Sequence, residues 1–223
     1  TATDETDGDI TSSITVNGTV DTSTVSTYTL IYNIADAASN TASVTRTVVV
    51  NPASTSSIYF ENGTCKCPNA TVGDTATISG TTYTVVDNST IYAEISNSNG
   101  NLCTTLVTTM SGLFSIPSWT FNSDIGFWDT SRVTNMENMF REASAFNQDL
   151  SNWNTSSVTL MKFMFTGDAY YTQFNGDCTT WDTGNVTDMD QMFSYAEKFN
   201  QDISSWDVSS VTTLEGMFAV AWA

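Results

Sequence analysis

Hydrophobic and polar positions recur with a fixed period in the second half of the chain. The dipeptide Phe-Asn opens four units, at Phe121, Phe146, Phe174 and Phe199, so the spacings are 25, 28 and 25 residues. A half unit, LVTTMSGLF at residues 106–114, matches the second half of the full units. A fixed period of this size predicts stacked supersecondary units that bury their apolar faces against one another.

The second half of each unit has helical spacing. In the first full unit the spaced apolar residues are Val133, Met136, Met139, Phe140 and Ala143. Thr134 with Glu137, and Thr212 with Glu215, have the spacing of a capping box, which predicts a helix that begins just after each Thr. Such a helix lasts about two turns, so neighbouring units must cover its apolar face.

The first half of each unit predicts a short strand and a turn. In the last unit, DISSWDVS places Ile203 and Trp206 among Ser and Asp. One strand and one short helix per 25 residues is the size of a leucine-rich-repeat coil. The three extra residues of the second unit fall within TGDAYYTQ, residues 166–173, where we expect a loop tip that tolerates insertion.

Polar and aromatic residues form columns through the stacked units. We expect the Asn column to bond the backbone, each Asp to accept N–H groups of its own turn, and the Trp column to lie in the core. A catalytic carboxylate needs a unique environment, so the repetition argues against a glycosidase pair. The columns are Asn122, Asn147, Asn175 and Asn200; Asp124, Asp149, Asp177 and Asp202; Asp129, Asn154, Asp182 and Asp207; and Trp128, Trp153, Trp181 and Trp206.

Two adjacent positions vary between the units while their surroundings repeat. A stack of regular units usually recognises ligands through such variable positions on one face. We therefore expect a recognition face at Phe127, Asn152, Thr180 and Ser205.

The segments before the repeats have a different pattern. TATISGTTYTVV, residues 75–86, alternates around Ser-Gly and predicts a β-hairpin, and STIYAEIS after it predicts a short helix. A stack of coils needs a cap over its first apolar face, and this segment is placed to supply it. We expect a β-rich α/β chain with a partial Ig-like β-sandwich at 1–52, a cap at 53–105 and a leucine-rich-repeat-like solenoid at 106–223.

Composition narrows the classes of function. The chain has 24 acidic and 6 basic residues and a formal charge of -18, which argues against nucleic acid and anionic membranes as partners. It has no His, which excludes His-dependent triads and His-ligated zinc. No apolar run approaches the roughly 18 residues of a membrane span. The polar start TATDETDGD shows no signal peptide and resembles an interior cut.

Four acidic residues are candidate calcium ligands. Asp4, Asp7 and Asp9 cluster before the first predicted strand, and Asp36 lies in a later turn. Clustered carboxylate oxygens suit Ca²⁺. The alternative is a solvated turn in which each Asp accepts backbone N–H groups.

The cysteines favour a disulfide over a metal site. Cys65 and Cys67 form a Cys-x-Cys, and the spacing leaves open which of them pairs with Cys103 in an oxidising compartment. A zinc site would need a fourth ligand, and no His is available. Cys178 takes the position that Ile125, Leu150 and Ile203 fill in the other units, which predicts a buried residue.

The repeat FNxDxxxWDxSxVTxMxxMF resembles the 25-residue unit of the bacterial surface-protein family DUF285, which is related to BspA-like leucine-rich repeats. The resemblance covers residues 106–223 and implies a secreted or surface-displayed solenoid linked to adhesion, without catalytic residues. The preceding KCPNATVGDT, YTVVD and LCTTLVT resemble the segment that often comes before these repeats, which implies a Cys67–Cys103 disulfide.

Residues 1–51 resemble the C-terminal part of a bacterial Ig-like domain of the DUF5011 kind, carried by ITSSITVNG, VSTYTLIYNIAD and TASVTRTVVV. An Ig-like sandwich has about 100 residues, so about half of one is expected here. The resemblance also implies an origin in Bacteroidota.

These features predict a non-enzymatic extracellular protein of a bacterial surface, with adhesion or ligand display as its role. Its partner would be a surface protein or glycan, or copies of itself. One alternative is a structural subunit of a filament or surface layer, in which strand complementation between subunits completes the sandwich. Another is an accessory binding module of a polysaccharide-degrading protein. Ligand, assembly state and glycosylation are left open by the sequence.

Overall fold

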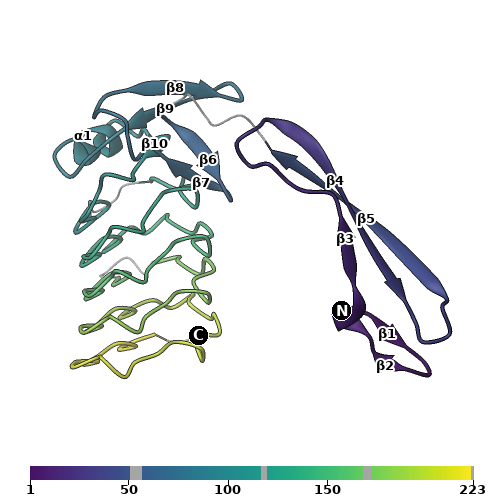
Figure 1. The fold of residues 1–223 in the computed structure, drawn as a ribbon. Coiled ribbons are helices and arrows are strands. Elements are labelled where there is room, and N and C mark those ends of the chain that lie inside the picture. The colour runs from purple at the N-terminus through teal and green to yellow at the C-terminus, as the bar shows by residue number, and fades with distance from the viewer. Residues whose placement is uncertain (51–56, 117–119, 168–171, 222–223) are drawn as a thin grey trace. The chain divides into compact units, whose positions relative to one another are not determined.

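The computed structural model describes residues 1–50, 57–116, 120–167 and 172–221. It divides into two compact units, Thr1–Thr55 (unit 1) and Ser56–Ala223 (unit 2). The described residues are β-rich, with one short α-helix, one 3-10 helix and several small sheets, none of which is closed (Figure 1).

Unit 1 is built around a three-stranded antiparallel sheet with the order β3-β4-β5. The two long strands pair along their whole length, from Ser26 opposite Val50 to Ala35 opposite Thr41. Asp36 accepts the backbone N–H of Asn40 at 2.7 Å, which closes the turn between them. The elements are β1 (Thr3–Asp4), β2 (Gly8–Asp9), η1 (Thr11–Ser13), β3 (Thr15–Asn17), β4 (Ser26–Ala35) and β5 (Thr41–Val50).

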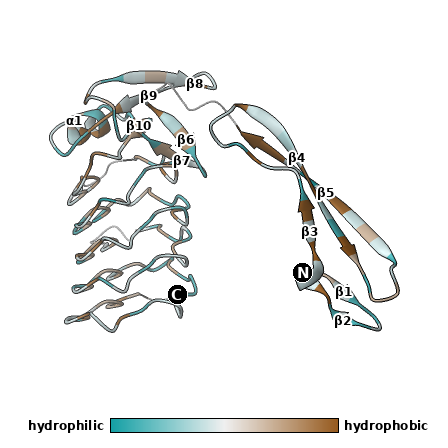
Figure 2. Cartoon of the chain, in the orientation of Figure 1, coloured by the Kyte–Doolittle hydropathy of each residue, from teal (hydrophilic) through white to brown (hydrophobic). Residues whose placement is uncertain are grey.

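The sheet of unit 1 has an apolar face that no other described element of unit 1 buries. Side chains alternate between the two faces of a strand, so Tyr28 and Tyr32 share a face with their partners Val48 and Val44. Figure 2 shows the resulting alternation along β4 and β5. No described residue of 1–50 is buried, and Val44 is 66% exposed. The predicted partial sandwich is therefore a single layer within this unit.

Unit 2 opens with residues 57–105, here called the leading segment. The β8–β9 hairpin turns at Ser79 and Gly80, whose φ angles of 52° and 86° are the pair that a type I′ turn requires. This hairpin and the helix that follows it confirm the two elements predicted for the segment. The elements are β6 (Tyr59–Glu61), β7 (Thr64–Lys66), β8 (Thr75–Ile78), β9 (Thr81–Val85), α1 (Ile91–Ser96) and β10 (Leu102–Cys103), with β10 parallel to β9.

Residues 106–221, here called the coil stack, follow as successive coils (Figure 1). Each coil meets the next through one parallel bridge, in a line of residues Thr109, Asn135, Leu160, Asp188 and Thr213. The backbone bonds continue on both sides of this line; the N–H of Met136 donates to the carbonyl of Leu160 at 2.9 Å, and that of Thr134 to Thr108 at 2.9 Å.

The predicted helices of the repeats are wrong. No helix occurs in the described part of the coil stack. The cause is a left-handed residue three positions after the predicted helix start; φ is 57° at Asn138, 56° at Phe163 and 51° at Gln191. A second left-handed residue follows four positions later in two of these coils, with φ of 61° at Glu142 and 59° at Tyr195. A left-handed residue cannot continue a right-handed helix. The helical spacing of Met and Phe instead arises from tight turns that direct these side chains inward.

The predicted capping boxes are also wrong. The hydroxyls of Thr134 and Thr212 donate to carbonyl oxygens of the preceding coil, Thr108 at 3.3 Å and Thr187 at 2.9 Å. The N–H of Glu137 donates to Asn135 Oδ1 at 2.8 Å. The strand predicted around Ile203 and Trp206 is absent as well, because the bridged residues lie in the other half of the coil. Residues 168–171, within the predicted loop tip, lie outside the described residues.

The apolar core of the coil stack is made of aligned aromatic columns. The rings of Phe114, Phe140, Phe165, Phe193 and Phe218 stack from coil to coil with centroids 4.9–5.6 Å apart. Each described Trp indole donates Nε1–H to a carbonyl of the preceding turn of chain; Trp181 donates to Leu150 at 3.0 Å. Trp is therefore core, as predicted, and Cys178 is fully buried beside it.

The polar columns confirm their predicted backbone roles. Asn122 Oδ1 accepts the N–H of Asn147 at 2.8 Å, and the same bond repeats at each later coil. Asp149 Oδ1 accepts the N–H of Ser151 at 2.8 Å within its own turn. Asn154, in the column that begins at Asp129, accepts the N–H of Ser156 in the same way. These bonds hold each turn in place and set the register between coils.

Candidate functional site

The four predicted recognition residues occupy unlike environments. Thr180 donates its hydroxyl to the carbonyl of Ser151 at 2.7 Å, and Ser205 donates to Thr179 at 3.0 Å. Both hydroxyls thus join neighbouring coils. Asn152 is exposed and has no hydrogen bond within the described chain. The predicted recognition positions are therefore chemically different in the first two full coils.

Phe127 connects the leading segment to the coil stack. Its half-buried ring lies 5.9 Å from Phe60 and 5.5 Å from Tyr83, centroid to centroid. The backbone carbonyl of Phe127 also accepts the N–H of Cys65 at 2.8 Å. Packing and a backbone bond hold this ring in one position.

A small hollow, here called the junction pocket, lies beside Phe127. The turn of the β6–β7 hairpin reaches it at Gly63, whose φ of 84° suits glycine. A side chain at Gly63 would come within 3.9 Å of Asn152 Nδ2, so the hairpin tip lies close to the second coil. The pocket is lined by Gly63, Asp124, Gly126, Phe127, Asp149 and Asn152.

The junction pocket is rich in hydrogen-bond acceptors. Asp124 Oδ1 accepts the N–H of Gly126 at 2.8 Å, and Asp149 Oδ1 accepts that of Ser151 at 2.8 Å. The second oxygen of each carboxylate has no hydrogen bond within the described residues. No Lys or Arg lines the pocket. The sequence pattern predicted the Asp columns. It did not predict that Gly63 lies beside Asp124 and Asp149, because these residues come from distant segments of the chain.

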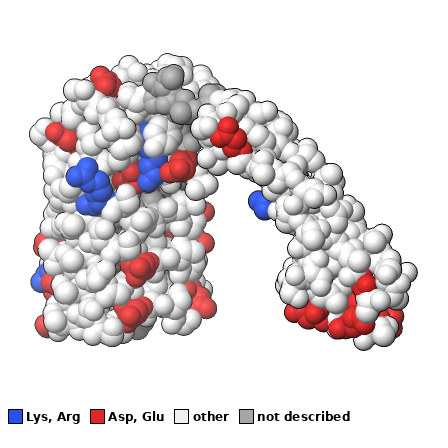
Figure 3. Space-filling view, viewed as in Figure 1, with Lys and Arg blue, Asp and Glu red and all other residues white. Residues whose placement is uncertain are grey.

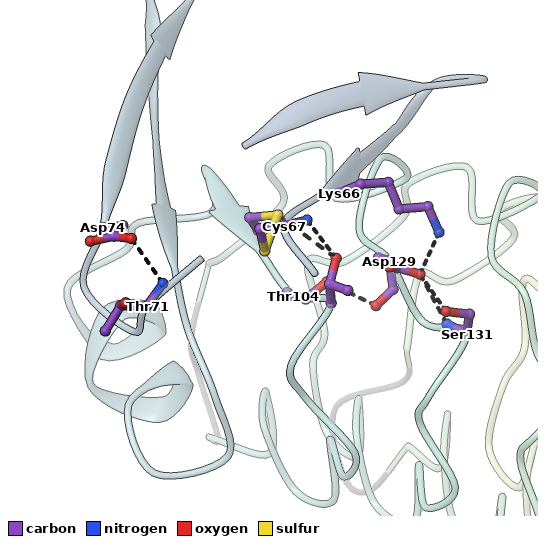
Figure 4. The surroundings of a disulfide bond; sticks show 9 residues. Lys66, Cys67, Thr71, Asp74, Thr104, Asp129 and Ser131 are labelled. Atoms are coloured by element: carbon purple, nitrogen blue, oxygen red, sulfur yellow. Dashed lines mark hydrogen bonds and ion pairs between the residues drawn. A yellow bond between two sulfur atoms is a disulfide. The ribbon is translucent and has the colours of Figure 1, made fainter. Parts of the chain in front are cut away.

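A buried ion pair lies near the pocket and connects the leading segment to the first full coil. Lys66 Nζ is 2.9 Å from Asp129 Oδ1, and the Asp129 side chain is 2% exposed (Figure 4). Burial acts to raise the pKa of Asp129, but hydrogen bonds from Ser131 and Lys66 hold it below its usual value. The second oxygen, Oδ2, is buried and has no hydrogen-bond partner among the residues that the structure describes.

The structure joins Cys67 to Cys103, the pairing that the family resemblance implied (Figure 4). Cys65 and Cys178 are free and buried. Burial raises the pKa of each thiol to about 12, with smaller contributions from the charges of Asp129 and Asp177 respectively. Because the thiolate is the reactive form, neither cysteine is suited to nucleophilic chemistry at neutral pH.

The predicted calcium ligands lie at one end of unit 1, where Figure 3 shows acidic side chains gathered. Asp4, Asp7 and Asp36 line one depression, and Asp9 does not. Asp7 Oδ2 accepts the N–H of Ala37 at 2.9 Å, which connects the two loops. The N–H groups of Asp7 and then Thr6 hold the pKa of Asp4 below its usual value.

Within the described residues, no group of three or more Asp, Glu, Cys or His side chains is arranged to hold a metal ion. The oxygens named above accept backbone N–H groups, which is the alternative that the sequence left open. Calcium binding stays a prediction. In the described parts of the chain, every helix is too short or too polar to cross a membrane.

Two protein-family models match the chain. The model described as Mycoplasma protein of unknown function, DUF285, matches residues 83–173 and 169–223. The model described as bacterial surface protein, Ig-like domain, matches residues 1–50. No curated protein and no solved structure gives a significant match.

Proposed function

Because the chain belongs to the DUF285 family and its first 50 residues match an Ig-like domain of bacterial surface proteins, we propose that it is an extracellular bacterial surface protein that displays a ligand-binding face. In this proposal unit 2 is a leucine-rich-repeat-like solenoid, and the leading segment is its cap. The two family matches together are the observation that carries the proposal.

The construction of unit 2 supports display rather than catalysis. Backbone bonds, Asn side chains and stacked rings fix each coil against its neighbour, so side chains on the outer turns are held in a regular array. Most carboxylates of that array accept N–H groups in near-identical turns. Catalysis would instead require one carboxylate in a distinctive environment.

Surface exposure is tested by antibody labelling of intact and lysed cells of the source bacterium. We expect labelling of intact cells and its loss after brief protease treatment. Labelling that requires lysis would contradict the surface location. Ligand display is tested separately by applying the purified chain to arrays of glycans and of extracellular-matrix proteins.

A structural subunit is the second candidate, and the apolar face of unit 1 favours it. A sheet with Val44 and Tyr32 on an uncovered face would be completed by strands from another copy. Electron microscopy and sedimentation at increasing concentration test this. Val44→Lys should abolish polymers, whereas Thr45→Lys, on the opposite face of the same strand, should not. Particles of constant mass would argue against the subunit role.

An accessory module of a polysaccharide-degrading protein is the third candidate. It predicts polysaccharide binding without turnover. Clear hydrolysis of a polysaccharide by the purified chain would contradict the non-enzymatic proposal.

A further inference from the structure

The junction pocket differs from the corresponding positions of the later coils. Two carboxylates, an unengaged amide and an aromatic ring converge there because the β6–β7 turn meets the first two full coils. The later coils carry Thr180 and Ser205 at the corresponding position, and both hydroxyls are used between coils. The repeated coils therefore provide equivalent positions, and contact with the β6–β7 hairpin makes one of these positions a distinct site.

Each group in the pocket has a definite capacity. The outer oxygens of Asp124 and Asp149 are strong acceptors because they belong to charged carboxylates. The inner oxygens accept backbone N–H groups, which fixes the orientation of each carboxylate. Asn152 offers two N–H donors and a carbonyl acceptor. The ring of Phe127 packs against both Phe60 and Tyr83 and is only half-buried, so part of its apolar surface is accessible.

The charge and size of the pocket limit the ligand. An anionic ligand would be repelled by two carboxylates that no basic residue of the lining offsets. The hollow holds about 200 Å³. Pockets for drug-sized molecules hold roughly 300–1,000 Å³, so this one suits a single small ring or the end of a chain.

We propose that the junction pocket binds one neutral sugar ring of a glycan. Neighbouring hydroxyls of the sugar would donate to Asp124 and Asp149, Asn152 would bond a further hydroxyl, and the C–H face of the ring would pack on Phe127. This inference rests on the proposed display function and names the ligand class for it.

The test uses the whole chain on an array of neutral, acidic and amino-bearing glycans, followed by calorimetry with the strongest neutral glycan. The first variant is Asp149→Asn, which keeps the Oδ1 acceptor for Ser151, as Asn154 does for Ser156, but replaces the outer acceptor with a donor. The second is Asn152→Ala, which removes an amide that has no bond in the described chain. The matched control is Asp202→Asn, the same column position two coils away, where Oδ1 accepts the N–H of Ser204.

We expect binding of a neutral glycan that is insensitive to salt. Asp149→Asn should weaken it about tenfold or more, the loss expected for one hydrogen bond to a charged acceptor, and Asn152→Ala should weaken it about fivefold, the loss expected for a neutral hydrogen bond. The control should bind as the wild type does. Equal loss in the control, or no loss in the pocket variants, would overturn the assignment. A preference for amino-bearing glycans that falls steeply with salt would show a cation site instead.

Different experimental outcomes would contradict the sugar assignment and the proposed display function. Binding of the chain to a protein on the matrix array, with no glycan bound at millimolar concentration, would overturn the sugar assignment and leave ligand display standing. No binding on either array, together with labelling only of lysed cells, would overturn both.

Discussion

Removing the Cys67–Cys103 disulfide should lower the free energy of unfolding of unit 2 substantially. The bond joins residues 36 positions apart. In the chain-entropy account a loop of 15 residues contributes about 3 kcal/mol and one of 100 residues about 4.7 kcal/mol, so this loop contributes about 4 kcal/mol. Both cysteines are fully buried, and Cys103 lies in β10, which pairs with β9. Loss of the disulfide should therefore destabilise the buried part of the leading segment as well as the loop that it closes.

The measurement is urea unfolding of the double variant Cys67→Ala with Cys103→Ala, monitored by Trp fluorescence. The matched control is Cys65→Ala, a buried free thiol in β7, two residues before Cys67. Loss of its sulfur should cost about 1 kcal/mol, through the small cavity left behind. A double variant no less stable than the control would refute the reasoning, because the cross-link would then contribute nothing beyond packing.

Three further results are expected. Trp181→Phe removes one of two N–H donors to the carbonyl of Leu150, which also accepts the backbone N–H of Trp153 at 3.1 Å. The lost bond and the smaller buried ring should together lower the free energy of unfolding in urea by about 2 kcal/mol, and a loss below about 0.5 kcal/mol would show that the indole contributes little. Because burial raises the pKa of Cys65 and Cys178 to about 12, neither thiol should react with Ellman's reagent in the native protein at about pH 8, and both should react in urea; a fast native thiol would contradict this. The N–H and hydroxyl of Thr179 hold the pKa of Asp177 in the folded protein below its ordinary value of 3.8. The ionised carboxylate therefore stabilises the fold above pH 3.8, and this stabilisation is lost as the pH falls through the pKa of the folded state. The advantage of the wild type over Asp177→Asn in urea should thus shrink below about pH 3.8, and an advantage independent of pH would exclude the carboxylate charge as its source.

The repeat period and the roles of its columns could be predicted from the sequence because they depend on identical residues in identical places. The Asn ladder and the buried Trp column follow directly from that repetition. The helices could not be predicted correctly, because apolar residues three and four positions apart fit both a helix and a series of inward-facing turns. What decides between them is the left-handed residue, and Phe163 gives no local sign of that conformation.

The junction pocket shows the other limit of sequence reasoning. Phe127 and Asn152 were identified in the sequence as variable positions. Gly63, which also lines the pocket, comes from the leading segment, far earlier in the sequence. Such a contact depends on how the β6–β7 hairpin packs on the first coils. The periodic pattern describes each coil against its neighbours and carries no information about that packing.

The coil-to-coil hydrogen bonds described above join successive turns of the chain, with separations such as 25 residues between Asn122 and Asn147. Duplication or loss of one whole unit in the gene would therefore leave every remaining contact intact. Each added unit would lengthen the stack by about one strand spacing, roughly 4.8 Å. The length of the stack could in this way change by recombination alone, and units beyond the second could be gained or lost without altering the residues of the junction pocket.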